Sequence, residues 1–464
     1  MQLLNNDGNG EPPLPSSNEK RIKMEKAIKT LVVNGIPYAF FRDNLSLFEL
    51  DKTDYEKYCK GALCEDDIVA MYQEANAAMD KINIAALQQD LTSVCLILTR
   101  RCTLRCKYCY SVDPHGDSSH DMSFSTARKA IDFLVENNPQ SKGYGIILFG
   151  GEPLMRFDLI KQIIDYCEAE ITIKRNKFVG YTMTTNGTII NDEIIEYFKK
   201  YNIGVQISLD GLKENHDKNR VFSTGVGSYD TIQNNIGKLM DNECSFMIHG
   251  TFDPYIDFFN TIKKLEDQKI PFGYGYTIDT IDNPQKITNY GFAELDDFRK
   301  SFDKLVNYYL EKSRNDEPIY CNNLISCITR IKNRMGKAYS CSAGRTAISI
   351  MPDGTILPCQ NFQKVKPMFQ GNILTGGILQ NKIHSKNVDT LTECESCWMK
   401  YLCGGGCYYE RYMQNVSMDF PPQAKCEILK LQMEFFLKLY ICLETEGLMS
   451  NFEKNIKNDH IRNI

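Results

Sequence analysis

The sequence lacks the long apolar runs that membrane segments need. No stretch of 18 or more apolar residues occurs among the 464 residues, so a transmembrane helix is not expected. Residues 1–17 are polar and rich in Asn, Gly and Pro, and they lack the apolar core of a secretory signal. We therefore expect a cytoplasmic protein with no membrane partner.

The chain also lacks an excess of positive charge. Its formal net charge is −5, whereas nucleic-acid binding depends on a concentrated basic field that releases phosphate counterions. No nucleic-acid partner is expected. One local basic cluster is predicted to be a solvated helix face, with capture of an acidic partner as the alternative; it consists of Lys20, Arg21, Lys23, Lys26 and Lys29.

No long-period repeat is present, and the length exceeds that at which one hydrophobic core keeps growing, so two or three domains are expected. Residues 1–18 are predicted to be a disordered tail, because three prolines oppose a helix there. Residues 19–90 are predicted to form a small α+β, winged-helix-like module. It has a hairpin over Ile36–Leu50, turning at residues 42–44, and helices over Asp54–Lys60 and Glu65–Lys81.

From Ser93 the pattern alternates between strands and helices, which is typical of parallel βαβ units and predicts an α/β fold over residues 91–290. The predicted strands are Val94–Thr99, Gly145–Phe149, Val179–Thr184, Gly204–Leu209, Ser245–Phe252 and Gly273–Thr277. The predicted helices are Ser125–Asn137, Phe157–Ile171, Asp192–Tyr201, Tyr229–Asp241 and Tyr255–Gln268. Ligand sites of such folds lie at the carboxyl ends of the strands.

Three further regions are expected after the alternating pattern. They are a helical bridge over 291–340, with a helix at Glu294–Lys312, a cysteine-rich domain over 341–430, and a C-terminal helical region over 431–464. The last helix is predicted to run from about Gln423 to Glu446.

Cysteine is abundant, with 18 residues, and clustered thiols in a reducing cytosol indicate metal binding or catalysis. Cys102, Cys106 and Cys109 follow the first predicted strand of the α/β region with C-x3-C-x2-C spacing. Three thiolates on one loop can hold a [4Fe–4S] cluster and leave one iron open. A zinc site would normally recruit a fourth Cys or His, and the next thiol, Cys167, lies on a predicted helix.

This loop resembles that of the radical S-adenosylmethionine (SAM) superfamily, and the resemblance covers roughly residues 93–280. Tyr108 occupies the family's aromatic position before the last cysteine. The resemblance implies a partial (β/α)6 barrel whose open iron chelates the amino and carboxylate groups of SAM. It also implies reductive cleavage of SAM to a 5′-deoxyadenosyl radical that abstracts a hydrogen atom, with an electron donor such as flavodoxin or ferredoxin.

Motifs at the ends of later strands are similar to the SAM-binding segments of this family. The resemblance implies that Gly150, Gly151, Glu152 and Pro153 grip the methionine ammonium, and that Thr185 and Asn186 belong to a ribose-contacting segment. Ser208 and Arg220 are expected to bind the SAM carboxylate through hydroxyl and guanidinium hydrogen bonds. The alternative is a strand-end serine and a surface arginine.

A second cysteine pattern begins at Cys341-x12-Gly354-x4-Cys359 and resumes at Cys394-x2-Cys397-x5-Cys403-x3-Cys407-x18-Cys426. It resembles the SPASM domain, an auxiliary-cluster module of peptide-modifying radical SAM enzymes; a pair of zinc ribbons is the alternative. The resemblance implies three [4Fe–4S] clusters in all. The distal cluster is expected on Cys394, Cys397, Cys403 and Cys426, and the proximal one on Cys341, Cys359 and Cys407, completed by Cys327 or left with an open iron.

These resemblances imply an oxidative peptide maturase that acts on a ribosomally made precursor peptide. A thioether crosslink is the favoured product and a carbon–carbon bond the other, with the leader peptide bound by the N-terminal module as an added strand. The alternative is a formylglycine-forming sulfatase-maturing enzyme, but Gln360 stands where that family has an aspartate base, and an amide cannot act as a general base. A zinc-held scaffold without activity is a further alternative. The peptide, the catalytic base and the oligomeric state are not predicted.

Overall fold

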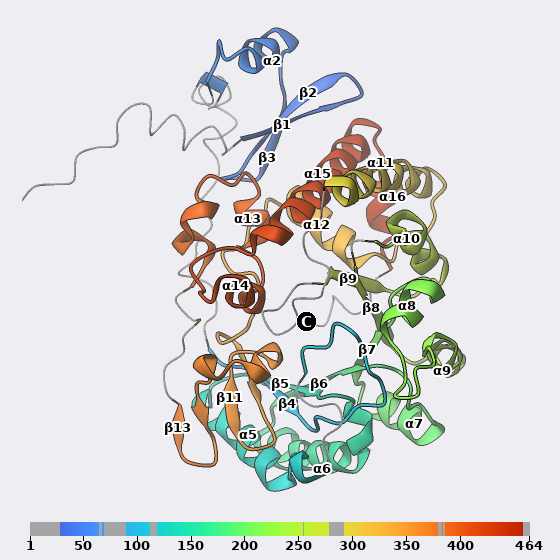
Figure 1. The fold of residues 1–464 in the computed structure, drawn as a ribbon, viewed down its shortest axis with the longest axis vertical. Helices are drawn as coiled ribbons and strands as arrows, with labels where there is room; N and C mark the ends of the chain where they lie inside the picture. Colours follow the sequence, from blue (N-terminus) through green and yellow to red (C-terminus); the bar gives the residue numbers. More distant parts are fainter. Residues whose placement is uncertain are drawn as a thin grey trace, which may run out of the picture.

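The computed structural model describes residues 28–64, 67–68, 90–111, 118–253, 255–277, 292–378, 383 and 386–457 (Figure 1). Its strands form two sheets: a three-stranded sheet of order β1-β2-β3 and a ten-stranded sheet of order β13-β12-β11-β10-β4-β5-β6-β7-β8-β9. The predicted tail over 1–18 and most of the predicted helix over Glu65–Lys81 lie outside the described residues.

The α/β fold predicted from the alternating pattern is confirmed, because all six predicted strands occur and pair in parallel. They are β4 (Ser93–Ile97), β5 (Gly143–Phe149), β6 (Phe178–Thr185), β7 (Gly204–Ser208), β8 (Phe246–Phe252) and β9 (Phe272–Tyr276). The helices between them are α5 (Phe124–Asn137), α6 (Phe157–Cys167), α7 (Asp192–Lys200), α8 (Lys213–Asn219), α9 (Tyr229–Asp241) and α10 (Phe258–Asp267). Of these, α8 was not predicted.

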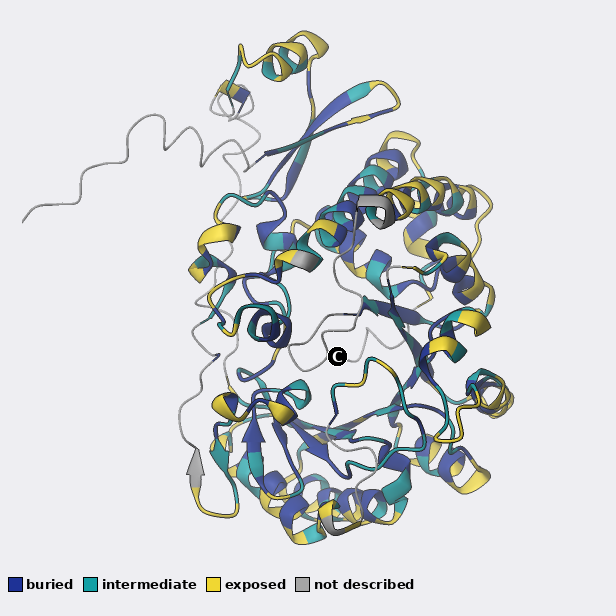
Figure 2. Cartoon of the chain, in the orientation of Figure 1, coloured by how far each residue is buried: buried dark blue, intermediate teal, exposed yellow. Residues whose placement is uncertain are grey.

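Side chains alternate between the two faces of these strands. In β8, Phe246 and Ile248 are buried, whereas Met247, His249 and Thr251 are half-buried. Successive strand residues point to opposite faces, and the amphipathic helices cover the outer face (Figure 2). The main hydrophobic core therefore lies between the sheet and its helices, and the inner face carries the less apolar side chains.

The cysteine-rich region continues the same sheet. β10 (Ala347–Ile350) pairs in parallel with β4, and β11 (Thr355–Leu357), β12 (Gly371–Asn372) and β13 (Gly377–Ile378) follow in antiparallel order. These four strands were not predicted. The sheet thus crosses the boundaries expected between residues 91–290 and 341–430.

The C-terminal part of the chain contains six α-helices within the described residues. They are α11 (Phe292–Arg314), α12 (Asn322–Lys332), α13 (Lys400–Cys403), α14 (Tyr408–Asn415), α15 (Gln423–Thr445) and α16 (Met449–Lys454). The predicted helices at 294–312 and 423–446 are confirmed, and they pack together through stacked rings of Phe302 and Phe435, 5.3 Å apart. Within the described residues, none of the helices is both long and apolar enough to cross a membrane.

Shorter helical turns lie between these elements. α6 runs into a π-helix over Glu168–Ile173. The 3-10 helices are Ser118–His120, Pro153–Arg156, Gln360–Lys364, Lys366–Met368, Val388–Thr390 and Thr392–Cys394.

The N-terminal module is an antiparallel sheet with one described helix. It contains β1 (Ile28–Val33), β2 (Ile36–Phe41), β3 (Ser46–Glu49) and α2 (Lys52–Cys59), so the predicted hairpin and first helix are confirmed. The prediction of a solvated helix face was wrong for Lys29, which lies on β1 and pairs with Glu434 of α15. The other members of that basic cluster lie outside the described residues.

The N-terminal sheet packs against the cysteine-rich region. The Phe40 ring meets Trp398 edge-on, with centroids 6.1 Å apart, and Arg42 donates a hydrogen bond to the carbonyl of Glu395. Glu395 directly follows Cys394, and Trp398 directly follows Cys397, so both contacts are made to the segment that carries two predicted distal ligands. The module is therefore joined to a predicted cluster-binding loop.

Candidate functional site

The first three predicted ligands lie together on the loop after β4. Burial raises the pKa of Cys102 to about 12, and Glu152, Cys106 and Cys109 add to this effect. Burial also raises the pKa of Cys106 to about 11, although neighbouring Arg220 opposes the shift. Three thiols this close repel one another as thiolates, and a bound cluster would supply the positive charge that relieves the repulsion.

Gly150 and Gly151 allow the loop after β5 to approach this cysteine loop at backbone distance. A Cβ at Gly151 would lie 2.3 Å from the carbonyl oxygen of Arg101, and one at Gly150 would lie 2.6 Å from that of Thr99. The Gly151 amide donates a hydrogen bond of 2.8 Å to the Thr99 carbonyl, and the Glu152 amide donates one of 2.8 Å to the Arg101 carbonyl. The double glycine thus fixes one side of the cysteine loop.

Substituting Gly151→Ala is expected to lower the free energy of unfolding by about 1–3 kcal/mol, because the added methyl group overlaps backbone atoms that cannot turn away. Gly237→Ala, in α9 with no atom within 4 Å of its Cβ position, is the matched control and should raise that free energy by about 0.5–1 kcal/mol. Denaturant unfolding measures both, and equal effects would contradict the close-approach argument.

Glu152 is fully buried and joins three loops. Its carboxylate accepts hydrogen bonds from the Leu154 amide at 3.0 Å, the Asn186 amide at 2.8 Å and the Thr185 hydroxyl at 2.8 Å. Burial raises the pKa of Glu152 to about 7, and these three donors oppose the rise. The predicted residues Glu152, Thr185 and Asn186 therefore lie together, and the Asn186 side-chain amide lies 3.4 Å from the Cys102 sulfur.

Arg220 and Asp210 form a buried ion pair beside Tyr108 of the cysteine loop. The guanidinium donates to the carboxylate at 2.9 and 3.1 Å, and Tyr108 donates its hydroxyl to the same carboxylate. The surface-arginine alternative was therefore wrong. Two guanidinium nitrogens of Arg220 already donate to Asp210, so fewer of its N–H groups are available to bind a SAM carboxylate. Asp210 itself was not predicted, although it lies only two residues after Ser208 at the end of β7.

Substituting Asp210→Asn is expected to lower the free energy of unfolding by about 3–5 kcal/mol, because it leaves the buried Arg220 charge without its partner. Asp303→Asn removes an exposed carboxylate that pairs with Lys438, and this control should have little effect because water screens that pair. Equal losses of stability in the two variants would argue against the buried pair as a structural anchor.

His249 lies beside Ser208 on the inner face of the sheet, since Ser208 and His249 are partners in the β7–β8 register. Burial lowers the pKa of His249 to about 4, and nearby Arg220 lowers it further, so the ring is neutral at neutral pH. Gly273 and Gly275 face the ring from β9, and Cβ atoms there would lie 3.8 and 3.9 Å from its carbons. Sequence reasoning missed His249, although its position in an alternating strand places it on the inner face.

Three of the cysteines predicted to hold the proximal cluster lie close together. Burial raises the pKa of Cys359, and Cys407 and Cys341 raise it further, so these three thiols are near neighbours. Tyr110 lies between this set and the first cysteine loop, because Cys109 and Cys359 are both its electrostatic neighbours. The Tyr110 ring is 6.1 Å from that of Tyr409 on α14. The two sets thus share a buried aromatic contact.

The predicted distal set surrounds a small hollow. All four of its cysteines line this hollow, namely Cys394, Cys397, Cys403 and Cys426. Burial raises the pKa of Cys426 to about 12, with further contributions from the other three thiols. A thiol-lined hollow suits a cluster held only by sulfur.

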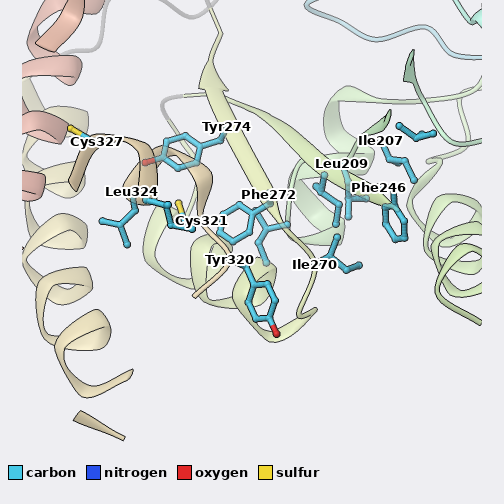
Figure 3. Close-up of a cluster of buried hydrophobic side chains, with 14 of the residues drawn as sticks. Ile207, Leu209, Phe246, Ile270, Phe272, Tyr274, Tyr320, Cys321, Leu324 and Cys327 are labelled. Carbon is cyan, nitrogen blue, oxygen red and sulfur yellow. The ribbon is translucent and has the colours of Figure 1, made fainter. Parts of the chain in front are cut away.

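Cys327, the predicted fourth ligand of the proximal cluster, belongs to the main hydrophobic core. It is buried on α12, its thiol donates toward the Met433 sulfur at 3.6 Å, and its charged neighbours are Arg330 and Lys337. Figure 3 shows Cys327 and Cys321 among hydrophobic side chains that include Leu324 and Tyr274. Over the described part of the chain, no three His, Cys, Asp or Glu side chains converge on a single-ion site.

Part of the chain matches a known protein family. Residues 96–265 match the Radical SAM superfamily. An uncharacterized protein of Methanocaldococcus jannaschii is 41% identical over 133 residues, which span 29% of this chain and 43% of that protein. The radical SAM cyclopropyl synthase TigE of Paramaledivibacter caminithermalis is 24% identical over 76% of this chain and 75% of its own. A cysteine-type anaerobic sulfatase-maturating enzyme of Clostridium novyi is 24% identical over 76% and 92%.

Solved structures share the fold. Native anSMEcpe with bound AdoMet has a TM-score of 0.62 at 17% identity, covering 76% of this chain and 99% of its own. Streptococcus suis SuiB bound to the precursor peptide SuiA has a TM-score of 0.51 at 17% identity, covering 86% and 98%.

Proposed function

From the radical SAM domain formed by residues 96–265, we propose that this enzyme is a maturase that oxidatively modifies a ribosomally made precursor peptide. The observation that carries the proposal is the gathering of cysteines into three sets, one on the loop of the radical SAM domain and two in the C-terminal region. The likeness in fold to SuiB, which was solved with a precursor peptide, supports the same class of substrate.

The three cysteine sets fit three [4Fe–4S] clusters. Cys102, Cys106 and Cys109 would hold the first, and the proximal and distal sets the two auxiliary clusters. We propose that the proximal cluster is open at one iron, because the Cys327 thiol contacts the Met433 sulfur. When bound, the first cluster and SAM supply a 5′-deoxyadenosyl radical that removes a hydrogen atom from the substrate. In the proposed SAM site, Ser208 offers a hydroxyl, and the segments Gly150–Pro153 and Thr185–Asn186 frame the cofactor. An electron donor such as flavodoxin or ferredoxin in a reducing cytosol completes the proposal.

Replacing Cys102, Cys106 and Cys109 together by Ala is expected to abolish 5′-deoxyadenosine formation, because no other thiol set lies on the loop of the radical SAM domain. The anaerobically purified variant should also lose about four of about twelve irons. Chromatographic assay of 5′-deoxyadenosine and iron analysis measure the two effects. Undiminished 5′-deoxyadenosine would refute the assignment of this loop.

We place leader-peptide binding on the N-terminal sheet. β3 is an edge strand of that sheet, and an extended peptide can add to a sheet edge through main-chain hydrogen bonds. The opposite edge, β1, faces α15 through the Lys29–Glu434 pair. β3 is therefore the edge to which we assign the leader.

A crosslink in the substrate peptide is the proposed product. A thioether is retained as the first choice, and the relationship to the cyclopropyl synthase TigE supports carbon–carbon bond formation as the second.

Formylglycine formation is the second candidate function, because sulfatase-maturating relatives align over three quarters of the chain. Against it, Gln360 follows Cys359 at the start of a 3-10 helix, and an amide cannot accept the proton that this reaction releases.

Anaerobic co-expression with a candidate precursor peptide is expected to yield a peptide lighter by two hydrogen atoms per crosslink, as resolved by mass spectrometry. The variant lacking Cys102, Cys106 and Cys109 serves as the control and should leave the peptide mass unchanged. An unmodified precursor, together with an aldehyde trapped by a hydrazine reagent in a sulfatase peptide, would decide for the second candidate.

A further inference from the structure

Arg411 is a buried cation without a carboxylate partner. It lies on α14 with no exposed surface, and no described carboxylate forms an ion pair with it. Its Nε donates a hydrogen bond of 2.8 Å to the carbonyl of Gly405, but its Nη1 and Nη2 have no hydrogen-bond partner. The nearby carboxylate of Asp419 binds Lys386 and Ser417 instead.

An unpaired buried charge is costly, by several kcal/mol, unless an anion or hydrogen-bond acceptor meets it. Arginine keeps its proton inside proteins, so Arg411 cannot escape this cost by becoming neutral. Part of its charge is met by the ring of Tyr408, 4.8 Å away. The two unpartnered nitrogens still require an acceptor.

The thiols around Arg411 belong to the two auxiliary sets. Its electrostatic neighbours after Tyr408 are Cys394 and Cys403 of the distal set and Cys407 of the proximal set. Gly405 makes room for it, because a Cβ at that position would lie 2.2 Å from Nη2. Gly405 also lines the hollow between the distal cysteines. The orphaned guanidinium therefore lies beside the space that the distal cluster would fill.

We propose that Arg411 is the counter-cation of the distal auxiliary cluster, to which its two unpartnered nitrogens donate hydrogen bonds, and that it makes this cluster easier to reduce. A cube with four thiolates carries net negative charge, which one-electron reduction increases, and a fixed cation stabilises the reduced form more than the oxidised form. Reduction adds one electron to the cluster and moves no proton at Arg411. The inference rests on the proposed iron–sulfur sites.

The test uses full-length protein in which Cys102, Cys106 and Cys109 are replaced by Ala, so that only auxiliary clusters remain. Potentiometric titration followed by electron paramagnetic resonance gives the ratio of reduced to oxidised cluster at a fixed potential. Arg411→Gln is expected to lower this ratio about tenfold, equivalent to about 59 mV for a one-electron couple. Arg411→Lys, which keeps the charge, should lower it about threefold at most.

Arg314→Gln is the control, because it removes an exposed guanidinium that pairs with Glu446 and should leave the ratio unchanged. The proposal would be overturned if Arg411→Gln binds its full iron and its ratio of reduced to oxidised cluster stays within twofold of that of the parent triple-alanine protein. Arg411 would then have only a packing role. If Arg411→Gln does not load iron, Arg411→Lys decides: loading with a near-parental ratio supports the counter-cation, and failure to load overturns it. A parent protein without auxiliary iron would instead refute the proposed function.

Discussion

Two residues with buried carboxylates, Glu152 and Asp210, hold the two ends of the cysteine loop, and the candidate site depends on them. Glu152 binds the segments after β5 and β6, and its own amide is bonded to the backbone just before Cys102. Asp210 binds Arg220, the Thr251 amide and the Tyr108 hydroxyl. Buried carboxylates with several donors resist displacement, because any movement strands charged or polar groups away from water. These hydrogen bonds fix the backbone on either end of the cysteine loop and therefore the positions of its three thiols.

The second organising feature is the continuous sheet. Because β10 pairs in parallel with β4, the chain that leaves β11 arrives with Cys359 close to the first cysteine loop. Tyr110 and Tyr409 fill the space between the two thiol sets, and both rings contact the same small hydrophobic cluster. The spacing between sets is thereby set by sheet register and ring packing, which are far less variable than loop conformation.

The sequence predicted the parallel sheet, the main helices and the grouping of the thiols, because apolar periodicity and short cysteine spacings are local signals. Contacts between distant segments were not predictable in this way: Lys29 pairs with Glu434, and β10 pairs with β4, only through the fold. The burial of Cys327 was also signalled by the sequence. Leu324, Cys327, Ile328 and Ile331 are all buried at helical spacing, which is typical of a core-facing helix. Lys29 was likewise misassigned, because its basic neighbours concealed a short apolar strand.

In the proposed leader-binding mode, the packing of the N-terminal sheet on Trp398 and α15 would set a geometric limit on which substrate residues are modified. A tether attached at a fixed anchor reaches only as far as its contour length, at most about 3.3–3.6 Å for each extended residue. Residues of a bound peptide that lie too near the anchored segment would not reach the inner face of the barrel. The enzyme would then select the modified residue by its distance along the peptide from the anchored segment. Pockets that recognise the side chains in between would be little needed.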